Sequence, residues 1–204
     1  MREIGLFPLG IVLLPGERVP LHIFEPRYRE LIGECLAEET EFGLLLADED
    51  GVREVGTTAA VVEVLERFDD GRLNIVVEGR DRFRVLTETE GRSFKTAQIL
   101  SLDDGSEEPT EDEVGRCLTA FRRLVEVAEA EAEEPEPGRE LLSYWLAARV
   151  DFGTEAKQEL LELGSERERV VRLTVLLDRA RELLRFTRTA RERAQGNGRV
   201  EPPG

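Results

Sequence analysis

The pattern of apolar residues changes once along this 204-residue chain, close to residue 103, and this change constrains the fold more than any other feature. Before it, short apolar runs are interrupted by Gly and Pro, which is typical of β-strands joined by tight turns. After it, the apolar segments repeat with the three- and four-residue spacing of amphipathic helices. The sequence therefore predicts an α+β protein in which strands and helices are segregated along the chain.

The first part, residues 1–103, is predicted to form a small closed or nearly closed β-barrel with one inserted helix. The helix follows Pro26, because the apolar residues from Tyr28 to Leu36 fall on one helical face. Asp69-Asp70-Gly71 is typical of a hairpin turn, and Glu78-Gly79 predicts a second break between strands. The predicted strands span residues 4–8, 11–14, 19–23, 42–47, 57–68, 72–77, 82–87 and 94–102.

Residues 104–113 are acidic and poor in apolar residues, which predicts a linker, and 114–195 are predicted to form a helical subdomain. Thr110 and Glu113 have the spacing of a capping box at the start of its first helix. A second helix is predicted to bury Trp145, the only tryptophan. The last helix has an apolar stripe that ends near Phe186, so its final turns should project from the body. Residues 196–204 are predicted to be a flexible tail.

The net charge of −16 indicates a protein that repels phosphate backbones, which disfavours nucleic acid as a partner. The acidic residues are concentrated before residue 139. No apolar run reaches the roughly 18–20 residues of a membrane span, so no membrane association is expected. Cys35 and Cys117 both fall on apolar helix faces and are predicted to be buried free thiols, which is typical of a reducing, cytoplasmic location.

The residues for common catalytic chemistries are missing from this sequence. Its two lysines, Lys95 and Lys157, do not follow a glycine, so there is no Walker A phosphate loop and no context for a Ser–Lys dyad. His22 is the only histidine, and its spacing from the two cysteines matches no zinc motif. We therefore expect no catalytic residues, no metal site and no cofactor.

Several segments, in order, resemble the N-terminal domain of Lon protease. The first runs through Phe7-Pro8-Leu9 and Leu14-Pro15-Gly16 to Pro20-Leu21-His22-Ile23-Phe24-Glu25-Pro26-Arg27-Tyr28. The second is Val55-Gly56-Thr57 with the apolar run after it, and the third runs from Asp70-Gly71 to Glu78-Gly79 and Phe83. The break between Leu163 and Ser165 followed by a long helix is similar as well, so the resemblance covers residues 3 to about 185.

The resemblance implies a PUA-like β pseudo-barrel followed by a helical bundle. It also implies a role, because this domain of the protease binds unfolded or tagged substrates. In the protease the final helix leads into ATPase and peptidase domains, whereas this sequence ends at Gly204. We therefore expect a stand-alone, non-catalytic module that recognises unfolded or partly folded polypeptides, with basic clients favoured by the acidic charge.

Recognition of unfolded chains is expected to use exposed apolar residues rimmed by charge. The candidates lie at the first bend and at the strand-to-helix junction: Leu13, Leu14, Pro15, His22, Ile23, Phe24 and Tyr28. For each of them, packing in the barrel core is the alternative interpretation.

A second hypothesis is an adaptor or regulator that docks on a folded protein partner. The residues for that role lie at the basic end of the last helix: Arg185, Arg188, Arg191 and Arg193. A solvated helix end is the alternative interpretation. A third hypothesis, an RNA-binding PUA-like module, rests on fold analogy alone and is opposed by the charge.

Overall fold

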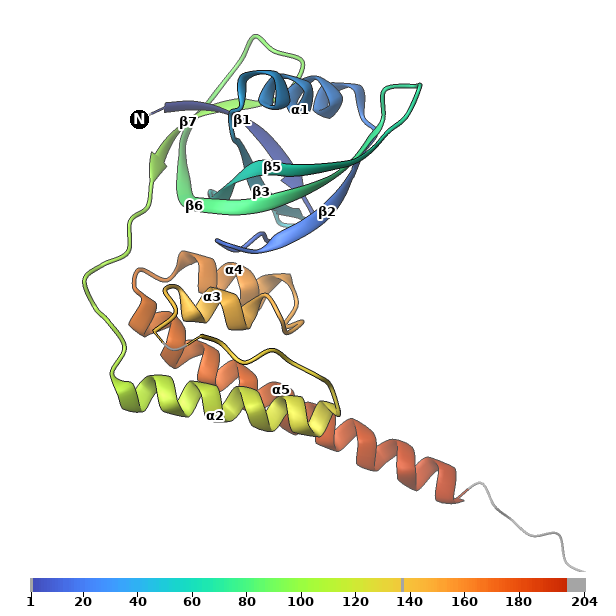
Figure 1. Cartoon of the computed structure of the whole chain (residues 1–204), viewed down its shortest axis with the longest axis vertical. Helices are drawn as coiled ribbons and strands as arrows, with labels where there is room; N and C mark the ends of the chain where they lie inside the picture. The colour runs from blue at the N-terminus through green and yellow to red at the C-terminus, as the bar shows by residue number, and fades with distance from the viewer. Residues whose placement is uncertain (1, 137, 198–204) are drawn as a thin grey trace, which may run out of the picture.

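The structure is a computed structural model that describes residues 2–136 and 138–197. It confirms the predicted α+β class, because all strands lie before residue 102 and, apart from one inserted helix, the helices follow (Figure 1). Most of the tail predicted at 196–204 lies outside the described residues. Within these residues no helix is both long and apolar enough to cross a membrane.

The strands form a closed barrel. Their order is β1-β7-β6-β5-β3, and a parallel pairing of β1 with β3, with Leu6 opposite Gly43, returns the sheet to its first strand. The remaining pairings around the ring are antiparallel. In addition, β2 pairs with the N-terminal part of β6, and β4 pairs with the C-terminal end of β3. The strands are β1 (Arg2–Leu9), β2 (Arg18–Ile23), β3 (Phe42–Asp48), β4 (Gly51–Val52), β5 (Val55–Arg67), β6 (Leu73–Thr89) and β7 (Thr96–Ser101).

The inserted helix, α1 (Pro26–Glu38), covers one opening of the barrel. Tyr28, Leu31, Ile32 and Cys35 are buried on its inner face, as their spacing predicts. They join the barrel core with Phe7, Phe42 and Ile75. Cys35 and Cys117 are both free and buried, and burial raises the pKa of the Cys117 thiol to about 11.

The helical subdomain contains α2 (Glu111–Ala128), α3 (Leu142–Ala147), α4 (Thr154–Glu162) and α5 (Glu166–Asn197). The predicted capping box starts α2: the Thr110 hydroxyl accepts from the Glu113 N–H, and the Glu113 carboxylate accepts from the Thr110 N–H. α2 packs along α5, and the C-terminal part of α5 extends beyond the other helices (Figure 1). The predicted projection of the last helix is therefore confirmed.

A shared core joins the barrel to the helices. One cluster of buried residues contains helical residues such as Phe121 together with four residues from the barrel side, Val12, Leu14, Leu46 and Val55. Lys157 of α4 also pairs with Glu17 at 2.9 Å, with both side chains largely buried. The two subdomains are therefore packed as one body.

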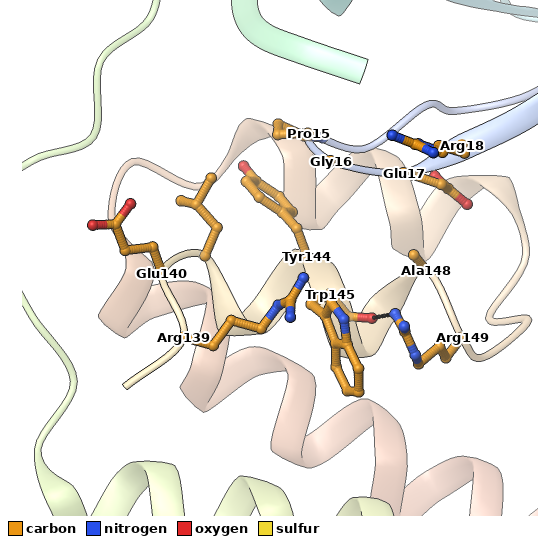
Figure 2. A pocket seen from close by; sticks show the side chains of 11 residues that line it. Pro15, Gly16, Glu17, Arg18, Arg139, Glu140, Tyr144, Trp145, Ala148 and Arg149 are labelled. Carbon is orange, nitrogen blue, oxygen red and sulfur yellow. Dashed lines mark hydrogen bonds between the residues drawn. The ribbon is translucent and has the colours of Figure 1, made fainter. Parts of the chain in front are cut away.

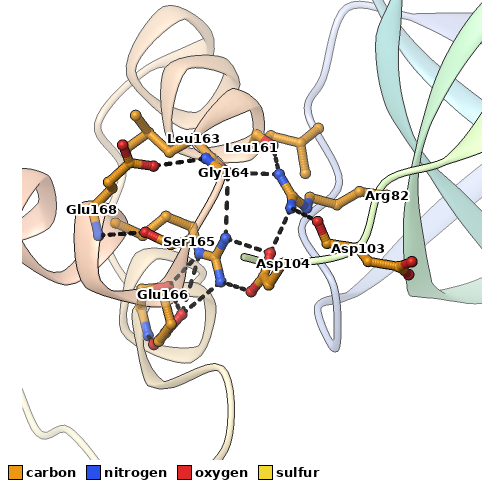
Figure 3. Close-up of polar contacts among 11 residues, drawn as sticks. Arg82, Asp103, Asp104, Leu161, Leu163, Gly164, Ser165, Glu166 and Glu168 are labelled. Atoms are coloured by element: carbon orange, nitrogen blue, oxygen red, sulfur yellow. Dashed lines mark hydrogen bonds and ion pairs between the residues drawn. The ribbon is translucent and has the colours of Figure 1, made fainter. Parts of the chain in front are cut away.

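A network of polar side chains that includes two buried arginines crosses the same junction (Figure 3). Arg82 of β6 donates to the carbonyl oxygens of Leu161 and Leu163, over 3.0 and 2.6 Å, and to Asp104. Arg169 of α5, with no exposed surface, also donates to Asp104 and to Glu166. Asp104 thus bridges two buried guanidinium groups, although it lies in the segment predicted to be a linker.

Three local predictions are wrong. Residues 11–14 form no strand, because they pair with no neighbouring strand, although Val12 and Leu14 face the helices and Leu13 faces the barrel. β6 continues without the predicted break through Gly79, where the absence of a side chain lets the Leu14 carbonyl oxygen approach the strand closely. Trp145 is only half-buried, and the fully buried aromatic residue of α3 is Tyr144.

Candidate functional site

The structure separates the seven residues predicted to bind polypeptides into two groups. Leu13, Leu14, Pro15, Ile23 and Tyr28 are buried and belong to the packing of the barrel and its junction. His22 and Phe24 are exposed, and Phe24 is 60% exposed as a residue. For these two residues the surface role stays a prediction, whereas the other five hold the fold together.

The alternation of β2 places His22 and Phe24 outside. Val19, Leu21 and Ile23 point inward, so the residues between them face solvent. Phe24 follows the end of the strand and stacks on His22, with ring centroids 5.9 Å apart and an interplanar angle of 20°. The edge of the Phe68 ring meets His22 at 6.0 Å and 82°. We call His22, Phe24 and Phe68 the aromatic patch.

Phe68 reaches the patch through the β5–β6 hairpin. Its N–H donates to the Arg72 carbonyl oxygen over 3.0 Å, and its own carbonyl oxygen accepts from Gly71. Gly71 has a φ of +86°, a conformation that favours glycine in this turn. The Arg72 guanidinium lies 4.9 Å from the Phe68 ring centroid and holds the ring in place. Phe68 is not among the predicted residues, because only the pairing of β2 with β6 brings it beside His22.

A row of hydrogen bonds across three strands orients His22. Asn74 Nδ2 donates to Glu66 over 3.0 Å, so the carbonyl oxygen of the same amide faces His22. His22 Nδ1 donates to that oxygen over 2.6 Å. The imidazole is thereby fixed with one face available to stack on Phe24.

The rim of the aromatic patch carries carboxylates and arginines in equal number. The neighbouring segments contribute Glu25, Glu66, Asp69 and Asp70 on one side of this balance and Arg27, Arg29, Arg67 and Arg72 on the other. The Arg72 N–H donates to Asp70 and lowers the pKa of this carboxyl below its usual value, so it stays ionised. In the described part of the chain no three His, Cys, Asp or Glu side chains converge as metal ligands. The arrangement offers apolar contact surrounded by a rim of mixed charge.

The arginines predicted to dock a partner are only partly described. Arg185 is exposed, while Arg188 pairs with Glu129 at the end of α2 over 2.8 Å. Arg191 and Arg193 lie on α5, but their side chains are outside the part of the molecule that the structure describes. Next to these positions, Leu183 and Phe186 are 67% and 74% exposed.

A barrel with an inserted helix, followed by a bundle that ends in a long helix, is also the fold of solved Lon N-terminal domains. A Lon N-terminal domain protein from Xanthomonas campestris has a TM-score of 0.68 and 23% sequence identity, with 86% of this chain and 98% of that chain covered. The N-terminal domain of Mycobacterium avium complex Lon protease has a TM-score of 0.66 and 19% identity over the same shares.

The sequence comparison places the chain in a family. The profile of the ATP-dependent protease La (LON) substrate-binding domain matches residues 3–179, and the chain belongs to this family. Lon protease of Parabacteroides distasonis is 26% identical over 200 residues, which are 89% of this chain and 24% of that protein. Lon protease of Anaeromyxobacter dehalogenans is 28% identical over 86% of this chain and 23% of that protein. The chain therefore spans about a quarter of the length of these relatives.

Proposed function

We propose that this chain is a non-catalytic recognition module that binds unfolded polypeptide segments at the aromatic patch. The observation that carries the proposal is the exposure of Phe24, an aromatic side chain stacked and held in place yet 60% open to solvent. Burying an aromatic side chain on binding is favourable, and rigid rings lose little conformational entropy. Membership in a family described as a substrate-binding domain supports the same role.

The surrounding charge narrows the class of client. The net charge of −16 attracts cationic segments and repels acidic ones over a Debye length of about 8–10 Å. Clients at the aromatic patch are therefore unfolded segments that combine apolar and basic residues. Their affinity should fall as salt is added.

Replacing Phe24 by alanine tests the proposal. The variant should bind a fluorescent, permanently unfolded polypeptide about 5- to 30-fold more weakly than the wild type, because burying the rest of the ring contributes roughly 1–2 kcal/mol. Fluorescence anisotropy measures the binding, and the folded parent of the polypeptide should not bind. Leu100→Ala removes an exposed apolar side chain from β7 and should leave the affinity unchanged. Equal affinities for wild type and Phe24→Ala would contradict the proposal.

The adaptor hypothesis has one observation in its favour, the exposed pair Leu183 and Phe186 on the projecting part of α5. On this hypothesis the full chain, immobilised on a column, retains a folded partner protein. A chain truncated after Leu184 should not retain it. Its helical circular dichroism should fall only by the removed turns, because the shared core of the two subdomains lies before this point. Unchanged retention of the partner by the truncated chain would exclude docking through this helix end.

A further inference from the structure

A cavity lies at the junction of the two subdomains, at the opposite end of β2 from the aromatic patch. It encloses about 380 Å³ between the loop 15–18 and the segment 139–149 (Figure 2). Its walls carry three arginines, Arg18, Arg139 and Arg149, and the side chains of Tyr144 and Trp145. We call this hollow the junction cavity.

The junction cavity is locally basic in an acidic protein. The carboxylates that line it are Glu17 and Glu140, and Glu17 is already engaged by Lys157 and by the Leu14 N–H, each at 2.9 Å. Arg18 pairs with Glu78, which also pairs with Arg80. The local excess of guanidinium groups therefore favours an anion here.

Arg139 is the cation most available to a ligand. Arg149 donates to the Trp145 carbonyl oxygen over 2.9 Å and pairs with Glu133 at 3.3 Å. Arg139, by contrast, makes no ion pair among the side chains that the structure describes, and its guanidinium rests 5.0 Å from the Trp145 ring centroid. Figure 2 shows Arg139 and Arg149 on either side of Trp145, so the indole holds both guanidinium groups toward the same space.

A neighbouring hollow of about 480 Å³ continues from the cavity in one direction and shares Arg139, Glu140 and Leu141 with it. Its other walls combine apolar residues such as Val114, Leu118 and Pro135 with the charged residues Glu108, Arg122, Glu136 and Glu166. Leu141 stands between the two hollows with 41% of its side chain exposed. The combined shape suits an extended ligand whose negative charge stays at Arg139 and whose apolar groups contact Leu141.

Tyr144 adds a buried hydrogen-bond donor to the wall. The residue is 1% exposed, and its hydroxyl has no hydrogen-bond partner within the described residues. Burial raises its pKa to about 12, so the phenol keeps its proton and remains a donor. Its ring lies between the junction cavity and Arg169, whose guanidinium is 4.4 Å from the ring centroid.

We infer that the junction cavity is a second binding site, for an extended acidic peptide segment whose carboxylate pairs with Arg139 and whose apolar side chains contact Leu141 and Trp145. A short peptide carries only one or two negative charges, so the repulsion by the whole protein is small, whereas a nucleic acid meets it at every phosphate. The carboxylate is supplied by a peptide C-terminus or by an acidic side chain. This site does not depend on the aromatic patch.

Trp145, the only tryptophan of the chain, lines this cavity, and its emission provides the readout for a ligand bound there. The probe is a synthetic decapeptide that ends in leucine, glutamate and leucine with a free carboxylate. It should change the emission in a saturable way, and Arg139→Gln should weaken the binding about tenfold. Arg123→Gln, the same charge change at an exposed position of α2, should leave it unchanged.

Two further peptides distinguish the sources of the carboxylate. Loss of binding by the C-terminal amide identifies the terminal carboxylate, and loss by a peptide with glutamine in place of glutamate identifies the side chain. Equal binding of all three peptides, or equal binding by wild type and Arg139→Gln, overturns the inference.

The Phe24→Ala variant separates this inference from the proposed function. If Phe24→Ala abolishes the decapeptide signal, the peptide binds at the aromatic patch and the junction site is excluded. If Phe24→Ala leaves both the unfolded polypeptide and the decapeptide bound, the aromatic patch is excluded while the junction site stands.

Discussion

Replacement of Asp104 by alanine is expected to destabilise the folded protein by about 3 kcal/mol, the lower end of the range for removing one partner of a buried ion pair, because the Asp104 side chain itself is 28% exposed. Asp104 accepts from Arg82 and from Arg169, whose side chains are 5% and 0% exposed. Without the carboxylate, both guanidinium groups remain in the junction with only carbonyl groups, Glu166 and Ser143 as partners. Urea denaturation followed by circular dichroism measures the change in the free energy of unfolding.

A matched surface pair gives the control for Asp104. Glu88 pairs with Lys95 at 2.9 Å, and about half of each side chain is exposed. Because water screens such pairs, Glu88→Ala should cost less than about 1 kcal/mol. A similarly small effect for Asp104→Ala would show that the junction network orients the two subdomains but adds little to the free energy of unfolding.

The same carboxylate predicts a pH dependence. Burial by itself would raise the pKa of Asp104, but the hydrogen bonds and charge of Arg169 and Arg82 outweigh it and lower the pKa below the usual value. A lowered folded-state pKa contributes stability that is fully present above the unfolded value of about 3.9 and is lost as the pH falls through the folded value. The difference in stability between wild type and Asp104→Ala should therefore shrink below about pH 4 and stay constant above about pH 5.

Periodic sequence patterns predicted the regular elements well. Tyr28, Leu31, Ile32 and Cys35 share a helical face that has only one way to be buried, and the structure buries them together. Asp69-Asp70-Gly71 forms the predicted hairpin turn, because the left-handed conformation of Gly71 is a local requirement. In both cases the information lies within a few residues of the chain.

Features that depend on distant partners were not predictable. Leu13 and Leu14 carry no sign that they face two different cores, since the helices that bury Leu14 follow about a hundred residues later. Asp104 looks like one of many acidic linker residues, and its two arginine partners come from β6 and α5. Of the candidate surface residues, His22 and Phe24 stay exposed because the alternation of β2 points them outward, and Phe68 joins them through strand pairing.

Replacement of Gly79 by alanine is expected to destabilise the protein by about 3 kcal/mol, at the upper end of the range for overpacking. A Cβ built at this position lies 2.3 Å from the Leu14 carbonyl oxygen and 3.2 Å from Leu13 Cγ. The backbone cannot move aside easily, because Gly79 donates to the Glu17 carbonyl oxygen and accepts from the Gly16 N–H, both at 2.9 Å. Thermal and urea unfolding measure the loss of stability.

The position of the glycine decides the sign of the effect. Gly33 lies on the exposed face of α1 with nothing within 4 Å of a built Cβ, so Gly33→Ala should stabilise the protein by about 0.5–1 kcal/mol through helix propensity. In Gly79→Ala the loop 14–17 must be displaced, and this loop forms one wall of the junction cavity. Trp145 emission should therefore shift in Gly79→Ala and not in Gly33→Ala. A Gly79→Ala variant with wild-type stability and emission would mean that the contact between β6 and this loop is loose, and the junction cavity would then lack the rigid wall that a specific site requires.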